Sequence, residues 1–236
     1  MASKVKMEPA VMRRFERKEK RRAESTKQIR YYYLIVCEGE KTEPHYFESL
    51  RDALPPHVLD VCSFTIQGTG YNTRTLVDKA IKERKKLEID RARKIDKLWV
   101  VFDKDSFTAE EFNAAIQICN AAENTEAAWT NEAFELWYLL HFDAHNTALS
   151  REQYKPKIEA AFKAKGLNSF KYKKNSREMF SLLSEHGSLA KAIQRAEALH
   201  NSYGDKQDYA EQNPCTTLYS MVAHLLNLAD ELTEEI

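Results

Sequence analysis

The chain lacks several features that mark secreted, zinc-binding and membrane proteins. Only four of its 236 residues are cysteine, and no two of them form a C-x-x-C pair. This scatter argues against a zinc site and against a disulfide framework. No apolar run approaches the roughly 20 residues of a membrane-spanning helix, and the basic N-terminus has no apolar segment of the kind found in secretory signals. We therefore expect a cytoplasmic protein with no membrane partner.

The chain also has no internal repeat and no low-complexity tract. Its 43% hydrophobic and 31% charged residues are typical of a soluble globular protein. At 236 residues it is long enough for one large domain, or for one domain with an appendage.

Charge is balanced overall but unevenly distributed. Residues 1–30 contain eleven lysines and arginines and four glutamates, a charge of +7, so residues 31–236 carry −7. A basic arm on an acidic body is typical of a protein with an anionic partner, usually nucleic acid. We expect a flexible arm that raises affinity for nucleic acid without reading its sequence. The alternative is a solvated arm that only keeps the protein soluble.

Short apolar runs alternate with helix-like stretches in the first 150 residues. The expected strands cover residues 31–37, 61–66, 98–102 and 127–129. The expected helices cover residues 44–50, 72–93, 109–122 and 132–142. This alternation predicts βαβ units, and hence an α/β fold with a parallel sheet of about four strands flanked by helices.

After about residue 150 the strand signal ends. Helices are expected over residues 156–165, 176–185, 188–202 and 215–233. The sequence therefore predicts three parts: a basic arm (1–30), an α/β core (31–150) and a helical extension packed on the core (151–236).

Three acidic residues follow two of the expected strands. Glu38 comes directly after the first strand, and Asp103 and Asp105 come directly after the third. Ligands of open parallel sheets bind beyond the carboxyl ends of the strands. Carboxylates that converge there repel one another, and a hard cation such as Mg²⁺ or Mn²⁺ relieves the repulsion. The sequence predicts a metal site formed by these residues; the alternative is that they only cap the following helices.

Two enzyme classes carry a D-x-D pair after an apolar strand. Residues 100–106 look like the strand end of haloacid-dehalogenase phosphatases, but that chemistry needs a later lysine and a later acidic pair, and no downstream aspartate follows a convincing strand. The Toprim arrangement fits better. It places a Glu-Gly pair after the first strand and D-x-D after the third, which is the order of Glu38-Gly39 and Asp103-Lys104-Asp105.

Four ordered stretches resemble the RloB-like proteins: residues 35–44, 99–105, 130–142 and 213–217. The resemblance spans roughly residues 31–226. It implies a Toprim-like core, a place in prokaryotic anti-phage defence or abortive infection, and, as in some relatives, an AAA-type ATPase partner. In Toprim nucleases the matching residues serve metal-dependent phosphodiester cleavage, which implies that role for Glu38, Asp103 and Asp105.

Further candidates lie near these motifs. Glu43 either binds a second metal ion or interacts with a helix dipole. Glu135 lies among apolar residues, where an unpaired carboxylate is costly to bury, which favours a ligand or proton acceptor. We expect Glu135 to share a helix face with Asn131, four residues earlier. His141 either relays protons or is a core histidine.

Phosphate contacts are also expected near the predicted metal site. Lys41 and Lys104 could meet a phosphate as point charges. The Gly68-Thr69-Gly70 segment precedes a helix and could hold a phosphate through its backbone N–H groups. Tyr31, Tyr32 and Tyr33 are expected in the core.

The sequence thus favours a Mg²⁺- or Mn²⁺-dependent nuclease acting on DNA, RNA or tRNA in anti-phage defence. The alternative from another class is a non-catalytic sensor or adaptor subunit. In that case the acidic cluster is structural and the helical extension docks an ATPase.

Overall fold

The computed structural model describes residues 29–71, 73–105 and 107–234. Nearly all of the predicted basic arm therefore lies outside the described residues. Within them, no helix is both long and apolar enough to cross a membrane.

The core is a five-stranded, mostly parallel sheet. Its strand order is β2-β1-β3-β4-β5, and the first four strands run parallel. The strands are β1 (Tyr31–Cys37), β2 (Cys62–Gly68), β3 (Lys97–Asp103), β4 (Thr125–Asn131) and β5 (Cys215–Thr216). The predicted α/β fold with a mainly parallel, helix-flanked sheet is confirmed. Of the five strands only β5, which is antiparallel to β4, is absent from the sequence-based prediction.

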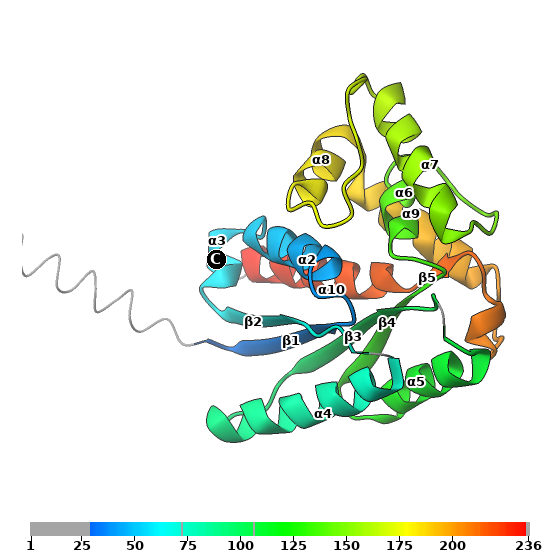
Figure 1. Ribbon diagram of the computed structural model, residues 1–236. Helices are drawn as coiled ribbons and strands as arrows, with labels where there is room; N and C mark the ends of the chain where they lie inside the picture. Colours follow the sequence, from blue (N-terminus) through cyan, green and yellow to red (C-terminus); the bar gives the residue numbers. More distant parts are fainter. Residues whose placement is uncertain (1–28, 72, 106, 235–236) are drawn as a thin grey trace, which may run out of the picture.

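Helices cover both faces of the sheet (Figure 1). One face carries α4 (Thr73–Asp90) and α5 (Ala109–Ala121), and the other carries α2 (Thr42–Asp52) and α10 (Leu218–Glu234). The side chains of β1 alternate between these faces, as the pleat of a strand requires. Leu34 and Val36 join the cluster with α4 and α5. On the opposite face, Tyr33, Ile35 and Cys37 join the cluster with α2 and α10.

Several helices lie beyond the sheet layers. A short helix, α3 (Pro56–Leu59), precedes β2, and α6 (Glu135–Leu140) follows β4. The later elements are α7 (Arg151–Ala164), α8 (Met179–His186), α9 (Leu189–Asn201) and the 3₁₀ turn η1 (Tyr209–Glu211). Buried residues of α6 to α10 belong to the same hydrophobic cluster as Tyr33 and Ile35 of β1. The division of the chain at residue 150 stays a prediction.

Two expected helices begin later than predicted. The expected helix over residues 132–142 shortens to α6, because residues 132–134 connect the end of β4 at Asn131 to the first helical residue. Asn131 therefore ends a strand and does not share a helix face with Glu135, and its side-chain amide donates to the carbonyl of Ala210. The helix expected from residue 215 begins at Leu218, after β5.

The connection through β5 fastens α10 to β4. The Thr217 backbone N–H donates to the carbonyl of Trp129 at 2.9 Å, and its hydroxyl donates to the carbonyl of Ala127 at 3.1 Å. The hydroxyls of Thr130 and Thr216 lie 2.9 Å apart. Residues 213–217, one of the four family-like stretches, thus have a structural role.

The carboxyl ends of β1, β2 and β3 meet at one edge of the sheet, because Cys37 pairs with Gly68 on one side and with Val101 on the other. A Cβ at Gly68 would lie 2.6 Å from the carbonyl oxygen of Glu40. Only glycine therefore lets the end of β2 approach the turn after β1 so closely. This contact fixes the position of the turn that begins with Glu38.

Candidate functional site

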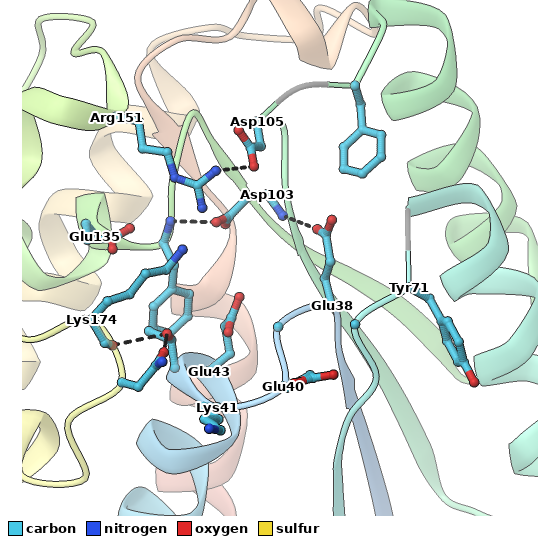
Figure 2. Close-up of a pocket in the computed structure, with 16 residues that line it drawn as sticks. Glu38, Glu40, Lys41, Glu43, Tyr71, Asp103, Asp105, Glu135, Arg151 and Lys174 are labelled. Atoms are coloured by element: carbon cyan, nitrogen blue, oxygen red, sulfur yellow. Dashed lines mark hydrogen bonds and ion pairs between the residues drawn. The ribbon is translucent and has the colours of Figure 1, made fainter.

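A pocket of about 530 Å³ opens at this edge of the sheet (Figure 2). It is lined by residues of the end of β3, of α2, α6 and α7, and of the loops that follow β1, β2, β3 and α7. Its acidic residues are Glu38, Glu40, Glu43, Asp103, Asp105 and Glu135, and its basic residues are Lys41, Arg151 and Lys174. The three predicted metal ligands therefore meet in one pocket. With every group ionised, acids exceed bases by three charges, so the pocket favours a cation.

Glu38 is held at the end of β1 by the neighbouring strand. Its backbone N–H donates to the carbonyl of Val101 at 2.9 Å, and its Oε2 accepts a hydrogen bond from the backbone N–H of Asp103 at 3.2 Å. Burial raises the pKa of Glu38 to about 7, and the charges of Glu43 and Asp105 act in the same direction. Glu38 thus changes its charge near neutral pH.

Asp103, at the end of β3, is a buried acid of the pocket. The residue is 8% exposed, and its Oδ2 accepts a hydrogen bond from the backbone N–H of Phe134 at 3.0 Å. Its Oδ1 is buried without a hydrogen-bond partner. Burial, together with the charges of Glu43 and Glu135, raises the pKa of Asp103 well above its usual range. A buried acceptor without a donor is costly, and a cation would satisfy it.

Glu43, in the first turn of α2, repeats this pattern. It is 6% exposed, and its Oε2 is buried with no hydrogen-bond partner. Burial raises its pKa, and the charge of Glu135 raises it further. A Cβ at Gly39 would lie 2.1 Å from that Oε2, so the glycine after Glu38 makes room for the Glu43 carboxylate.

Glu135 and Asp105 are each engaged by a residue from the helical part of the chain. Glu135, the first residue of α6, accepts a hydrogen bond from the Tyr172 hydroxyl at 2.7 Å. Asp105 forms an ion pair with Arg151, the first residue of α7. Figure 2 shows Arg151 reaching across the pocket towards Asp105.

The donor set suits a hard divalent cation in its chemistry. It consists of carboxylate oxygens, the ligands that Mg²⁺ and Mn²⁺ prefer, and two of these oxygens are buried without a partner. As the side chains stand, no group of three or more His, Cys, Asp or Glu among the described residues is arranged to hold an ion. Glu38, Asp105 and Glu135 instead face donors of the protein. An ion shared by Asp103 and Asp105 would compete with Arg151.

Three sequence-predicted residues lie outside the lining of this pocket. His141 is 3% exposed and its Nδ1 lies 2.9 Å from the carbonyl of Trp137. Burial lowers its pKa to about 4, so it is a neutral core histidine near neutral pH. Lys104 donates to the carbonyl of Phe107 at 2.6 Å within its own turn. Gly68 lies at the end of β2.

Two backbone N–H groups of the predicted phosphate-binding segment, residues 68–70, are used for hydrogen bonds within the protein. The backbone N–H groups of Thr69 and Gly70 donate to the carbonyls of Cys37 and Glu38, at 3.1 and 2.8 Å. They therefore hold the end of β2 against β1 and are not free for a phosphate. Gly70 itself lines the pocket, as do Lys41, Glu43 and Glu135.

Sequence reasoning missed Arg151, Lys174 and Tyr172. All three come from the part of the chain expected to be a helical extension, more than 40 residues after Asp103. No local motif marks them, and only tertiary packing brings them to the carboxylates.

Comparison with known proteins agrees with the sequence motifs. The family described as RloB-like protein matches residues 33–225, which include all the residues that line the pocket. The searches of curated proteins and of solved structures gave no match. Because the family match covers more than four-fifths of the chain, this protein belongs to the RloB-like family.

Proposed function

We propose that this protein is a metal-dependent nuclease that hydrolyses phosphodiester bonds of nucleic acid. The observation that carries the proposal is the convergence of Glu38, Glu43 and Asp103 in one pocket, with raised pKa values and two buried oxygens without partners. Proteins seldom bury such acids without a ligand, and strongly perturbed acids in a cleft mark functional sites. The order of Glu38 and the Asp103–Asp105 pair, shared with Toprim nucleases, supports the same function.

The acids divide into distinct roles. Glu38, Asp103 and Asp105 would hold Mg²⁺ or Mn²⁺, with Glu43 beside them. Such an ion, when bound, activates water and offsets charge on the phosphate. Burial raises the pKa of Glu43, and we propose it as the general base beside the ion. Tyr172 fixes the orientation of Glu135 by its hydrogen bond.

The basic residues of the pocket are suited to the substrate. Arg151 presents a planar guanidinium, which matches the oxygens of a phosphate in a bidentate manner. Lys174 and Lys41 lie on the same lining as point charges. In the nuclease, the Arg151 guanidinium would leave its ion pair with Asp105 and bind a substrate phosphate. Asp105 would then be free to bind the cation.

A second candidate function is that of a non-catalytic sensor or adaptor. Two observations favour it: no three potential ligands among the described residues are grouped to hold an ion, and Arg151 already neutralises Asp105. In that case the acidic pocket is structural and the helical part of the chain docks an ATPase.

The biological setting is proposed from the family resemblance alone. We place the protein in prokaryotic anti-phage defence, in the cytoplasm, acting with an AAA-type ATPase. If this is right, cells that carry the wild-type gene together with any neighbouring ATPase gene resist phage. The Asp103→Asn variant should lose that protection.

A cleavage screen tests the nuclease. Single-stranded DNA, duplex DNA, RNA and tRNA are incubated with Mg²⁺ or Mn²⁺, with the protein alone and with any ATPase encoded nearby. Wild type should cut at least one substrate and Asp103→Asn none. Asp230→Asn removes an exposed aspartate of α10 and serves as the matched control. Equal behaviour of wild type and Asp103→Asn on every substrate overturns the nuclease and favours the adaptor.

A further inference from the structure

A second groove adjoins the carboxylate pocket. It has a volume of about 680 Å³ and runs between the end of β2 and one face of α4. Its lining includes three lysines of α4, Lys79, Lys82 and Lys86, and it shares Tyr71 with the carboxylate pocket. We propose that this groove binds the backbone of single-stranded nucleic acid and leads the strand to the carboxylate pocket. The inference rests on the proposed function and specifies its substrate.

The three lysines form one row. They are spaced three and four residues apart, so they lie on the same face of α4, each about one helical turn (a rise of about 5.4 Å) from the next. All three are exposed. The only acid of the groove lining is Glu83, whose Oε1 accepts a hydrogen bond from Gln67 at 3.4 Å. The groove thus carries two positive charges in excess and complements a phosphate backbone.

Tyr71 supplies a flat aromatic surface at the junction. Tyr71 is 41% exposed, and Ile89 is the only other large hydrophobic residue that is exposed in the described part of the chain. The ammonium group of Lys79 lies 3.2 Å from the centroid of the Tyr71 ring. In Figure 2 the ring points away from Glu38, towards the side of the pocket on which α4 lies. An exposed ring beside a row of cations is the combination that binds single strands, because an unpaired base can stack on it.

Backbone contacts connect the groove with the pocket. The backbone N–H of Gly70 donates to the carbonyl of Glu38 at 2.8 Å. This hydrogen bond fixes the backbone of Gly70 next to Glu38, and Tyr71 is the following residue. The acids exceed the bases of the pocket by three charges, and a polyanion would be repelled there. The lysine row offsets this repulsion along the route by which a strand reaches the acids.

Binding measurements test the groove. Fluorescence anisotropy is recorded for the full chain in EDTA with single-stranded DNA, single-stranded RNA and duplex DNA of equal length, over a range of salt concentrations. The test variant is Lys82→Gln/Lys86→Gln. The control, Lys85→Gln/Lys163→Gln, removes the same charge from exposed lysines outside the groove, one of them on α4 itself.

The groove predicts a change in salt dependence. For a single strand, each phosphate that a lysine no longer neutralises lowers the slope of log affinity against log salt by about 0.7, so the slope of the test variant should fall by about 1.4. The control should keep the wild-type slope. Tyr71→Ala should weaken single-strand binding about tenfold with an unchanged slope, because stacking releases few ions, while Tyr71→Phe should bind like wild type.

The outcomes separate this inference from the nuclease. If the test variant binds like the control, or if duplex DNA binds as tightly as both single strands and Tyr71→Ala has no effect, the groove is not a single-strand site. The cleavage screen alone then decides whether the protein is a nuclease. If single strands bind through the lysines and yet no substrate is cut, the groove is confirmed as a single-strand site and the proposed nuclease activity is rejected. Whichever of DNA or RNA binds more tightly is the preferred strand.

Discussion

At the scale of single residues, the pocket contains acidic side chains whose ionised forms lower the stability of the folded protein. Glu38, Glu43 and Asp103 each have a raised pKa, for which burial is the largest cause. Folding therefore disfavours their ionised forms. Proteins keep such groups at sites where activity needs them, at the expense of stability.

Replacing Glu38 by glutamine should stabilise the metal-free protein at neutral to basic pH. The pKa of Glu38 is raised from 4.5 to about 7. The stability linked to its protonated form is fully present below pH 4.5 and is lost as the pH rises to about 7. A glutamine carries no charge and still accepts the hydrogen bond of the Asp103 N–H. Since Glu38 is partly exposed, we expect a gain of about 2 kcal/mol in the free energy of unfolding at pH 8.

Chemical denaturation of wild type and Glu38→Gln in EDTA, at pH 4.5 and pH 8, measures this effect. The difference between the two proteins should nearly vanish at pH 4.5. A variant less stable than wild type at pH 8 would show that Glu38 is not held in an unfavourable site.

His141 should affect acid stability and not catalysis. Burial lowers its pKa from 6.5 to about 4, so the unfolded chain takes up a proton below pH 6.5 while the folded protein stays neutral there. Stability is lost as the pH falls from about 6.5 to about 4, and the loss amounts to about 3 kcal/mol. His141→Gln should be less stable at pH 7 but should lose less stability over this window. Denaturation curves at pH 7 and pH 4.5 measure both effects.

The same variant decides between the two roles of His141. At a temperature where it is folded, His141→Gln should cleave at nearly the wild-type rate, since the residue does not line the pocket. A loss of cleavage as deep as that of Asp103→Asn would restore His141 as a catalytic residue.

At the scale of elements, the hydrophobic pattern of the sequence predicted the features that depend on neighbouring residues. β1 and β3 are apolar runs long enough to be recognised, whereas β2 alternates apolar and polar residues and β4 is apolar only over residues 127–129. Each predicted acidic motif lies at or just after the end of β1 or β3. β5 has only two residues and is formed by pairing with β4, so no pattern could reveal it. Residues 125–131 and 135–140 follow one another closely, and short apolar runs such as 127–129 and 136–140 do not by themselves separate strand from helix.

The helical part of the chain supplies side chains of the site that the sequence could not predict. Arg151 and Tyr172 reach Asp105 and Glu135 only because α7 and the loop after it pack beside α6. The acids of the site could be predicted because strand ends converge by topology. Arg151 and Lys174 could not be predicted, since their place in the pocket depends on tertiary packing.

Arg151→Gln should separate substrate binding from stability. The Arg151–Asp105 pair is partly exposed, with side-chain exposures of 38% and 34%, so its removal should cost no more than about 1 kcal/mol of stability. Without the bidentate interaction with a phosphate, kcat/KM should fall by about tenfold or more. Arg177→Gln, which removes an exposed arginine paired with Glu48, is the matched control. Equal kcat/KM values for the two variants would exclude Arg151 from the reaction.

At the scale of the whole molecule, charge is separated along the chain. Residues 1–30 carry +7 and the remainder carries −7, so the body as a whole repels nucleic acid. The lysine row of α4 offsets this repulsion locally. The arm, which lies almost entirely outside the described residues, would offset it at longer range.

Deletion of residues 1–29 should weaken binding without changing the chemistry. Each phosphate that the arm neutralises adds about 0.7–0.9 to the slope of log affinity against log salt, so the truncated protein should have a flatter slope. Cleavage at saturating substrate should remain nearly intact, because every described residue that lines the pocket lies between positions 38 and 175. An unchanged affinity and salt slope would assign the arm another role, such as binding a protein partner.

Binding of Mn²⁺ in the carboxylate pocket decides between the nuclease and the adaptor. Electron paramagnetic resonance measures free Mn²⁺ in titrations of wild type, Glu38→Gln, Asp103→Asn and Glu110→Gln at pH 8. Glu110 is an exposed acid of α5 outside the pocket, so Glu110→Gln controls for the loss of one charge. We predict that wild type and Glu110→Gln bind Mn²⁺ alike and that both pocket variants bind it at least about tenfold more weakly. If wild type binds no Mn²⁺, or if all four proteins bind it equally, the pocket is not a metal site.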